Sequence, residues 1–186
     1  MKEYLRSEIK KCISSWDKSD IYVVSLFVYN EDDNPCKPTV TLGYNTYTKF
    51  KSEIEYAWNE QEAKWNYACW LQNKELEFGT GDSKEIVKKW MKDHGFPYIS
   101  TEEIYQHGDF CEEEFYYITQ AFVNVLIEIV QELHKSGFIK EQFGKEIPIL
   151  IHELEYYDEI AEQNLKANPL ELSDELDDFV RFCTEV

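Results

Sequence analysis

Hydrophobic residues follow one another almost without interruption over residues 21–29, Ile-Tyr-Val-Val-Ser-Leu-Phe-Val-Tyr. Such a run of β-branched and aromatic residues predicts a strand that is buried on both faces. Residues 39–47 have the same character and come after a short polar turn at residues 30–35, which favours an antiparallel hairpin. A third strand is predicted over residues 147–155, with Pro148 at its start or at a sheet edge.

Apolar residues at intervals of three and four predict helices elsewhere. The clearest pattern covers residues 112–135, where Phe115, Ile118, Phe122 and Val125 belong to one continuous apolar stripe. A helix this apolar is expected to be central and to pack on a sheet. The same spacing, with caps at Asp82, Ser100 and Ser173, predicts further helices over residues 3–14 and 49–62, after Asp82, after Ser100, over residues 157–167 and after Ser173.

These elements predict an α+β fold in a single domain, residues 1–186. Its mainly antiparallel sheet, with strands near residues 21–29, 39–47 and 147–155, is covered by helices, and the long central helix lies near residues 112–135. The absence of repeats and of low-complexity linkers supports one domain, and 186 residues suffice for a sizeable core.

Charge changes this picture in one respect. The chain carries 37 acidic and 19 basic residues, a formal net charge of −18, which disfavours binding to nucleic-acid phosphates. Residues 1–101 hold 16 acidic and 14 basic residues, whereas residues 102–186 hold 21 and 5, so nearly all of the excess belongs to the second part. An acidic surface there would attract a basic partner, although acidity also serves solubility.

Other features of the sequence indicate a cytoplasmic protein. The first residues have no signal-like apolar run, and the longest apolar stretch, Phe122–Val130, includes Asn124 and Glu128 and is too short to cross a bilayer. The five cysteines form no Cys-x-x-Cys pair, which favours free thiols over disulfides or zinc. We expect neither a metal nor another cofactor.

Two segments carry candidate chemistry. Residues 152–158, His-Glu-Leu-Glu-Tyr-Tyr-Asp, could form a metal or acid–base site, or a polar strand end with helix-capping acids. Tryptophans and tyrosines gather at residues 56–70, where they could line a pocket, anchor an interface or fill the core. A pocket joining the two segments would support ligand binding, whereas an unpaired Glu155 facing water would count against catalysis.

Four elements in this order resemble a bacterial family, the domain-of-unknown-function family 4303. They are the strand at residues 21–29, the Trp-Asn-Tyr-Ala-Cys-Trp motif at residues 65–70, the Glu-Tyr-Tyr-Asp motif that ends at Asp158, and Asn164-Leu-Lys-Ala-Asn-Pro169. The resemblance spans most of the chain. It implies a small cytoplasmic protein with a role related to the immunity proteins of bacterial toxin systems, and it brings no established activity.

Two functional hypotheses remain open. The first is an acidic protein-binding module, such as a toxin-immunity protein, whose partner is a basic protein such as a toxin rather than nucleic acid or a membrane. The alternative is a small-molecule-binding protein or enzyme that uses the Trp65–Trp70 and Glu153–Asp158 segments. The candidate partner- or ligand-binding residues are Trp65, Asn66, Trp70, Glu153, Glu155, Tyr156, Tyr157, Asp158, Asn164 and Asn168.

Overall fold

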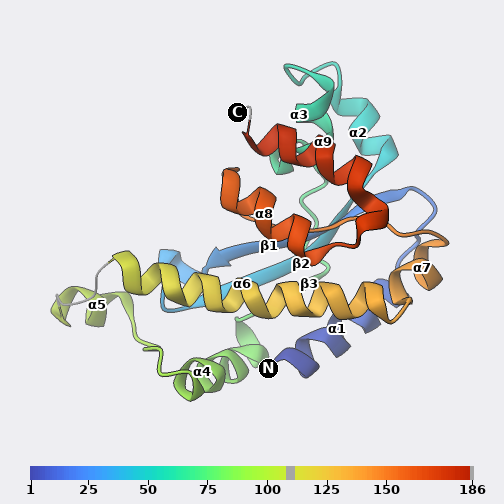
Figure 1. Cartoon of the computed structure of the whole chain (residues 1–186). Helices are drawn as coiled ribbons and strands as arrows, with labels where there is room; N and C mark the ends of the chain where they lie inside the picture. The colour runs from blue at the N-terminus through green and yellow to red at the C-terminus, as the bar shows by residue number, and fades with distance from the viewer. Residues whose placement is uncertain (108–111, 185–186) are drawn as a thin grey trace.

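The computed structural model describes residues 1–107 and 112–184, and helices pack on both faces of its four-stranded sheet (Figure 1). The strands are β1 (Ile21–Asn30), β2 (Pro38–Thr46), β3 (Leu76–Phe78) and β4 (Ile149–His152). The helices are α1 (Lys2–Ser14), α2 (Tyr47–Glu53), α3 (Glu60–Trp65), α4 (Lys84–Asp93), α5 (Thr101–His107), α6 (Glu112–Lys135), α7 (Phe138–Phe143), α8 (Asp158–Ala167) and α9 (Ser173–Thr184).

The sheet has the order β3-β2-β1-β4, with the predicted apolar strand β1 at its centre. β2 runs antiparallel to β1, with Leu26 opposite Leu42, so the predicted hairpin is confirmed. β4 runs parallel to β1 on its other side, with Leu26 opposite Ile151. Pro148 directly precedes β4 and contributes only its carbonyl, which accepts the Val24 N–H. The fold is therefore α+β with a mixed, mostly antiparallel sheet.

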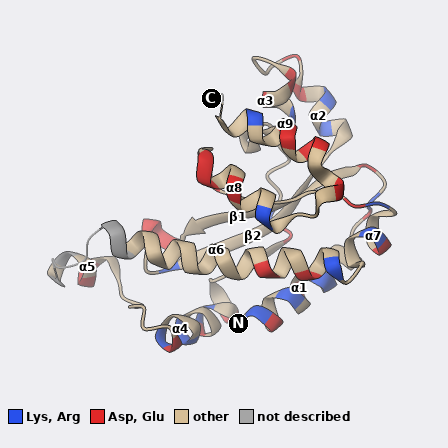
Figure 2. Ribbon diagram, in the orientation of Figure 1, with Lys and Arg blue, Asp and Glu red and all other residues tan. Residues whose placement is uncertain are grey.

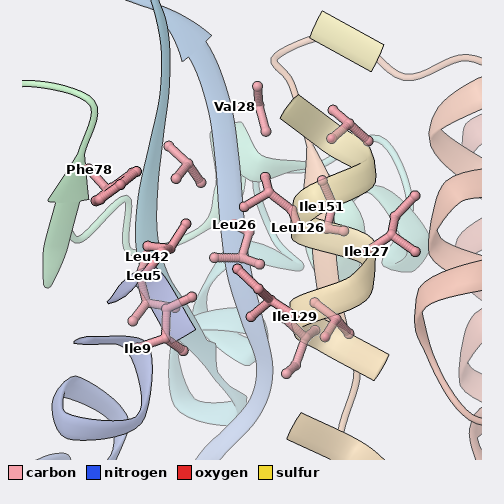
Figure 3. Close-up of a cluster of buried hydrophobic side chains, with 14 of the residues drawn as sticks. Leu5, Ile9, Leu26, Val28, Leu42, Phe78, Leu126, Ile127, Ile129 and Ile151 are labelled. Carbon is pink, nitrogen blue, oxygen red and sulfur yellow. The ribbon is translucent and has the colours of Figure 1, made fainter. Parts of the chain in front are cut away.

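Each face of the sheet supports its own hydrophobic cluster. Figure 3 shows the first cluster, in which Leu26 of β1, Leu42 of β2 and Leu126 of α6 meet the side chains of α1. The second cluster, on the opposite face, contains Leu150 of β4 and Phe179 of α9 together with residues of α2, α3 and α8. The sheet thus lies between two helical layers and packs against both, as expected for a central strand buried on both sides.

Two predicted boundaries were wrong, and one strand was not predicted. The helix expected over residues 49–62 is two helices, α2 and α3, separated by residues 54–59. The third strand ends at His152 rather than near residue 155, so Glu153 and Glu155 do not alternate on a strand. The three-residue strand β3 was not predicted, because a segment this short leaves no periodic pattern.

Candidate functional site

The break between α2 and α3 exposes a tryptophan. Asn59 caps α3, because its side-chain oxygen accepts the Glu62 N–H at 2.8 Å. The Glu62 carboxylate in turn accepts the Trp58 N–H at 2.6 Å, which restarts the helix after the break. The side chain of Trp58 is 95% exposed, and Tyr56 beside it is 80% exposed. A large aromatic surface of this kind typically marks an interaction site.

Asp178 of α9 fixes α3 in place. Its carboxylate accepts hydrogen bonds from Trp65 Nε1 at 2.8 Å, from Lys64 Nζ at 2.9 Å and from Gln61 Nε2 at 3.0 Å. Burial acts to raise the pKa of this carboxyl, but the three donors outweigh it and hold the pKa below its usual value. The predicted residue Trp65 is therefore a buried anchor of α3 rather than a residue that meets a ligand.

The two segments singled out in the sequence do meet. The ring of His152 lies 4.9 Å from that of Tyr67 and 5.5 Å from that of Trp70, measured between centroids. Tyr156 joins them, since its Oη accepts the Tyr67 N–H at 2.9 Å. Trp70 is buried and donates its indole N–H to the carbonyl oxygen of Lys64. Most of this aromatic contact is internal, and it holds the 153–157 segment against the 65–70 segment.

A pocket of about 580 Å³ opens above this contact. It contains Asn66 from the first segment and Glu155 and Tyr156 from the second. Its full lining is Trp58, Asn59, Gln61, Glu62, Asn66, Leu154, Glu155, Tyr156 and Phe182. The charged residues of this lining are both glutamates. The pocket therefore joins the two predicted segments and presents negative charge beside an exposed tryptophan.

His152 lies beneath the pocket but does not open into it. Both His152 and Ser25 are buried, and the Ser25 Oγ lies 2.8 Å from His152 Nε2. The other ring nitrogen, Nδ1, lies 3.1 Å from the carbonyl oxygen of Glu153, which can only accept, so Nδ1 carries the proton and Nε2 accepts from Ser25. Burial lowers the pKa of His152 to about 4, so the ring is neutral at physiological pH. The pair satisfies two polar groups between neighbouring strands.

Glu153 and Tyr157 point away from this pocket. They line a second, smaller pocket of about 230 Å³ against α6, together with Tyr116 and Gln120. Their side chains are hydrogen-bonded to each other, and burial raises the pKa of both. Asp158 is exposed at the start of α8, where the helix dipole favours a carboxylate. The acids of the 153–158 segment are thus divided among three surroundings rather than gathered in one site.

Asn164 and Asn168 of α8 act as a substitute strand along the free edge of β4. The Asn164 amide accepts the Ile151 N–H and donates to the Ile151 carbonyl, at 2.8 and 2.7 Å. One helical turn later, the Asn168 amide makes the same pair of bonds with Ile149, at 2.9 and 3.0 Å. Both asparagines are buried, so we assign them a structural role instead of the predicted binding role.

Of the predicted site residues, the pocket therefore contains Asn66, Glu155 and Tyr156. Trp58 was predicted as part of the aromatic cluster at residues 56–70 but not as a candidate binding residue, and Asn59 was not singled out, because both were placed inside a continuous helix. The signal was present, since Asn59 followed by Glu62 three residues later is a capping-box pattern that starts a new helix.

The surroundings of Glu155 count against a catalytic role. Its side chain is exposed at the pocket, and within residues 1–107 and 112–184 it has no hydrogen bond or ion pair. Across the same residues, no group of three or more His, Cys, Asp or Glu side chains is placed to hold a metal ion. An isolated, hydrated carboxylate is suited to attracting a cation and not to acid–base catalysis.

Four cysteines, Cys12, Cys36, Cys69 and Cys183, are free thiols as predicted, and Cys111 lies outside the described residues. The helices of the described ranges include none that is both long and apolar enough to cross a membrane. No family model, curated protein or solved structure matches the chain. The resemblance to family 4303 therefore stays a prediction.

Proposed function

We propose that the protein is a binding module for a basic protein, such as a bacterial toxin, and that it works in the cytoplasm. One observation carries the proposal: the 95% exposed Trp58 stands at a pocket whose charged lining residues, Glu62 and Glu155, are both acidic. Exposed tryptophan and tyrosine dominate the binding energy of many protein interfaces. Carboxylates around them select a basic partner and speed its approach.

The wider charge distribution supports this choice. Figure 2 shows mainly acidic residues over α8 and α9, which also carry Lys166 and Arg181, whereas acidic and basic residues are evenly mixed over α1 and α4. On α9, exposed acids include Asp174, Glu175 and Asp177. The pocket takes Phe182 from the same helix α9, so a basic partner that approaches it would experience attraction from these acids before contact.

We do not propose the small-molecule or enzyme alternative. Trp65 and Trp70, which that hypothesis needs at the ligand, are 1% and 3% exposed. The carboxylates of Glu153 and Glu155 belong to two different pockets, so they do not form an acid–base pair.

Binding to the purified basic proteins encoded beside the gene tests the proposal, with calorimetry at about 50 and 300 mM salt. We expect one of them to bind, and roughly a tenfold loss of affinity at the higher salt because surface charges are screened. Trp58→Ala should weaken binding by about tenfold or more, as loss of an interface hot spot does.

Leu170→Ala is the matched control, because Leu170 is 90% exposed but lies at a different pocket. It should bind like the unmodified protein. The proposal is wrong if none of these basic proteins binds, or if Trp58→Ala binds as tightly as Leu170→Ala.

A further inference from the structure

The pocket walls include aromatic rings from three separate parts of the chain. Trp58 stands at the rim, while Tyr156 and Phe182 lie deeper, with ring centroids 5.0 Å apart and planes at 69°. Leu154, which is 68% exposed, extends this apolar surface outward. Flat aromatic faces favour a planar cation, because the guanidinium group stacks on them while remaining charged.

The polar lining offers hydrogen-bond acceptors that the described part of the chain leaves open. Neither carboxylate oxygen of Glu155 has a partner among those residues, and Glu62 uses Oε2 for the Trp58 N–H. Gln61 donates its Nε2 to Asp178, which leaves its side-chain carbonyl oxygen available. A group with several N–H donors in one plane matches several acceptors better than a point charge does.

No basic side chain of the described residues lines the pocket to neutralise these carboxylates. The nearest lysine in sequence, Lys64, is already engaged: its Nζ is 2.9 Å from the Asp178 carboxylate and lies over the ring of Trp65. The negative charge of the pocket is therefore available to a positive charge supplied from outside.

We propose that the pocket accepts an arginine side chain of the partner protein, with the guanidinium stacked against Trp58 and hydrogen-bonded to Glu62 and Glu155. This inference rests on the proposed function and makes it more specific. Lysine is less suitable, since its ammonium group is strongly hydrated and cannot engage a ring face and two carboxylates in one plane. A free amino acid would leave unused the apolar surface of the pocket to which the exposed Leu154 belongs.

Nuclear magnetic resonance titration with Nα-acetyl-arginine-N-methylamide tests the inference without the partner. The indole N–H signal of Trp58, assigned by its loss in Trp58→Phe, reports binding. We expect a dissociation constant on the order of 1–10 mM, typical of a single side chain. The citrulline analogue, which has the same shape without the charge, should bind roughly tenfold more weakly, and the lysine analogue should also bind more weakly.

Glu155→Gln should reduce the affinity for the arginine analogue by about fivefold or more, and it should fold normally because Glu155 is exposed. Glu85→Gln on α4 is the matched control, since the Glu85 side chain is 78% exposed and lies away from the pocket; it should leave the affinity unchanged. Equal binding of the arginine and citrulline analogues, or an unchanged affinity in Glu155→Gln, would overturn the inference.

The two proposals can fail separately. If a basic partner binds through Trp58 but the arginine analogue does not shift the Trp58 signal, the arginine pocket is wrong and the binding module stands. If the arginine analogue binds with the stated preference and no basic protein does, the pocket chemistry stands and the proposed function is wrong.

Discussion

At the scale of single residues, His152 shows how burial decides what a polar group does. The sequence placed it among three carboxylates, where a charged or metal-binding imidazole was conceivable. In the fold it lies among aromatic rings, with Ser25 and the Glu153 carbonyl as hydrogen-bond partners. Its neighbours in the sequence leave the strand and point elsewhere, so their charges do not compensate for the lost hydration. The ring is therefore neutral.

This neutral state makes stability depend on pH. The pKa of His152 is about 4 in the folded protein and about 6.5 in the unfolded chain, so between these values the unfolded chain alone binds the proton. The contribution of neutral His152 to the free energy of unfolding is complete well above pH 6.5 and decreases as the pH falls towards 4. At pH 5 this contribution has decreased by about 2 kcal/mol.

Urea denaturation of the unmodified protein and of His152→Gln, from pH 7.5 to pH 5, checks this. Comparing the two proteins cancels the other titrating groups. We expect the difference between their free energies of unfolding to decrease by about 2 kcal/mol as the pH falls. A constant difference over this range would show that the folded protein takes up the proton as readily as the unfolded chain.

At the scale of elements, side-chain caps explain both the successes and the failures of prediction. The box at Ser100 is confirmed, because the Ser100 N–H donates to the Glu103 carboxylate and the Glu103 N–H donates to Ser100 Oγ. The box predicted at Asp82 was wrong: α4 begins at Lys84, and the hydroxyl of Ser83 accepts the Gly79 N–H instead. Similar motifs are used for a helix start or for a turn according to the tertiary structure around them.

At the same scale, no local sequence pattern predicted the role of the asparagine pair on α8. A spacing of four residues places Asn164 and Asn168 on one helical face, but only the parallel docking of β4 on β1 puts that face along a free strand edge. Edge strands are usually protected by charge, by proline or by a covering element. Here a helix covers the edge and also supplies the hydrogen bonds of a missing strand.

Removing one of these amides should destabilise the protein and loosen a specific site. Asn164→Ala leaves the buried N–H of Ile151 without its partner, which costs about 1–3 kcal/mol, whereas the Ile151 carbonyl keeps the hydrogen bond from Gln163 Nε2. Amide hydrogen exchange should speed up most at Ile151 in Asn164→Ala and most at Ile149 in Asn168→Ala.

Asn124→Ala on α6 is the control, because Asn124 is exposed, and it should change stability by no more than about 0.5 kcal/mol. If Asn164→Ala costs no more than this control, the edge of β4 does not depend on the asparagine amide.

At the scale of the whole molecule, the central sheet and the helix packed on it were easier to predict from the sequence than the candidate site. The strands β1 and β2 and the helix α6 were predictable because their hydrophobic patterns are long and consistent with burial. The candidate site was predictable only in part, because aromatic residues 65–70 and acidic residues 153–158 gave no sign of which side chains would face inward. That division depends on which helices pack on each face of the sheet. The order of residues along the chain does not show which face each segment will meet.

The same arrangement predicts that both clusters unfold together. Side chains of β1 alternate between the two clusters over residues 26–28, as Leu26 packs in the first cluster and Phe27 against the second, so loss of this strand would disrupt both clusters. The indole N–H signals report on each side separately: Trp16 and Trp90 belong to the first cluster, and Trp65 and Trp70 to the second. In a urea titration, all four signals should disappear at one midpoint.

Matched substitutions in the two clusters test whether they unfold together. Ile129→Val in the first cluster and Ile160→Val in the second each remove one buried methyl group from a site that is at most 1% exposed, at a cost of about 1 kcal/mol. Each should lower the midpoint of all four indole signals equally. If Ile160→Val lowers the midpoint of the second cluster's tryptophans alone, the two layers are separate folding units, and the sheet does not couple them as its burial on both faces requires.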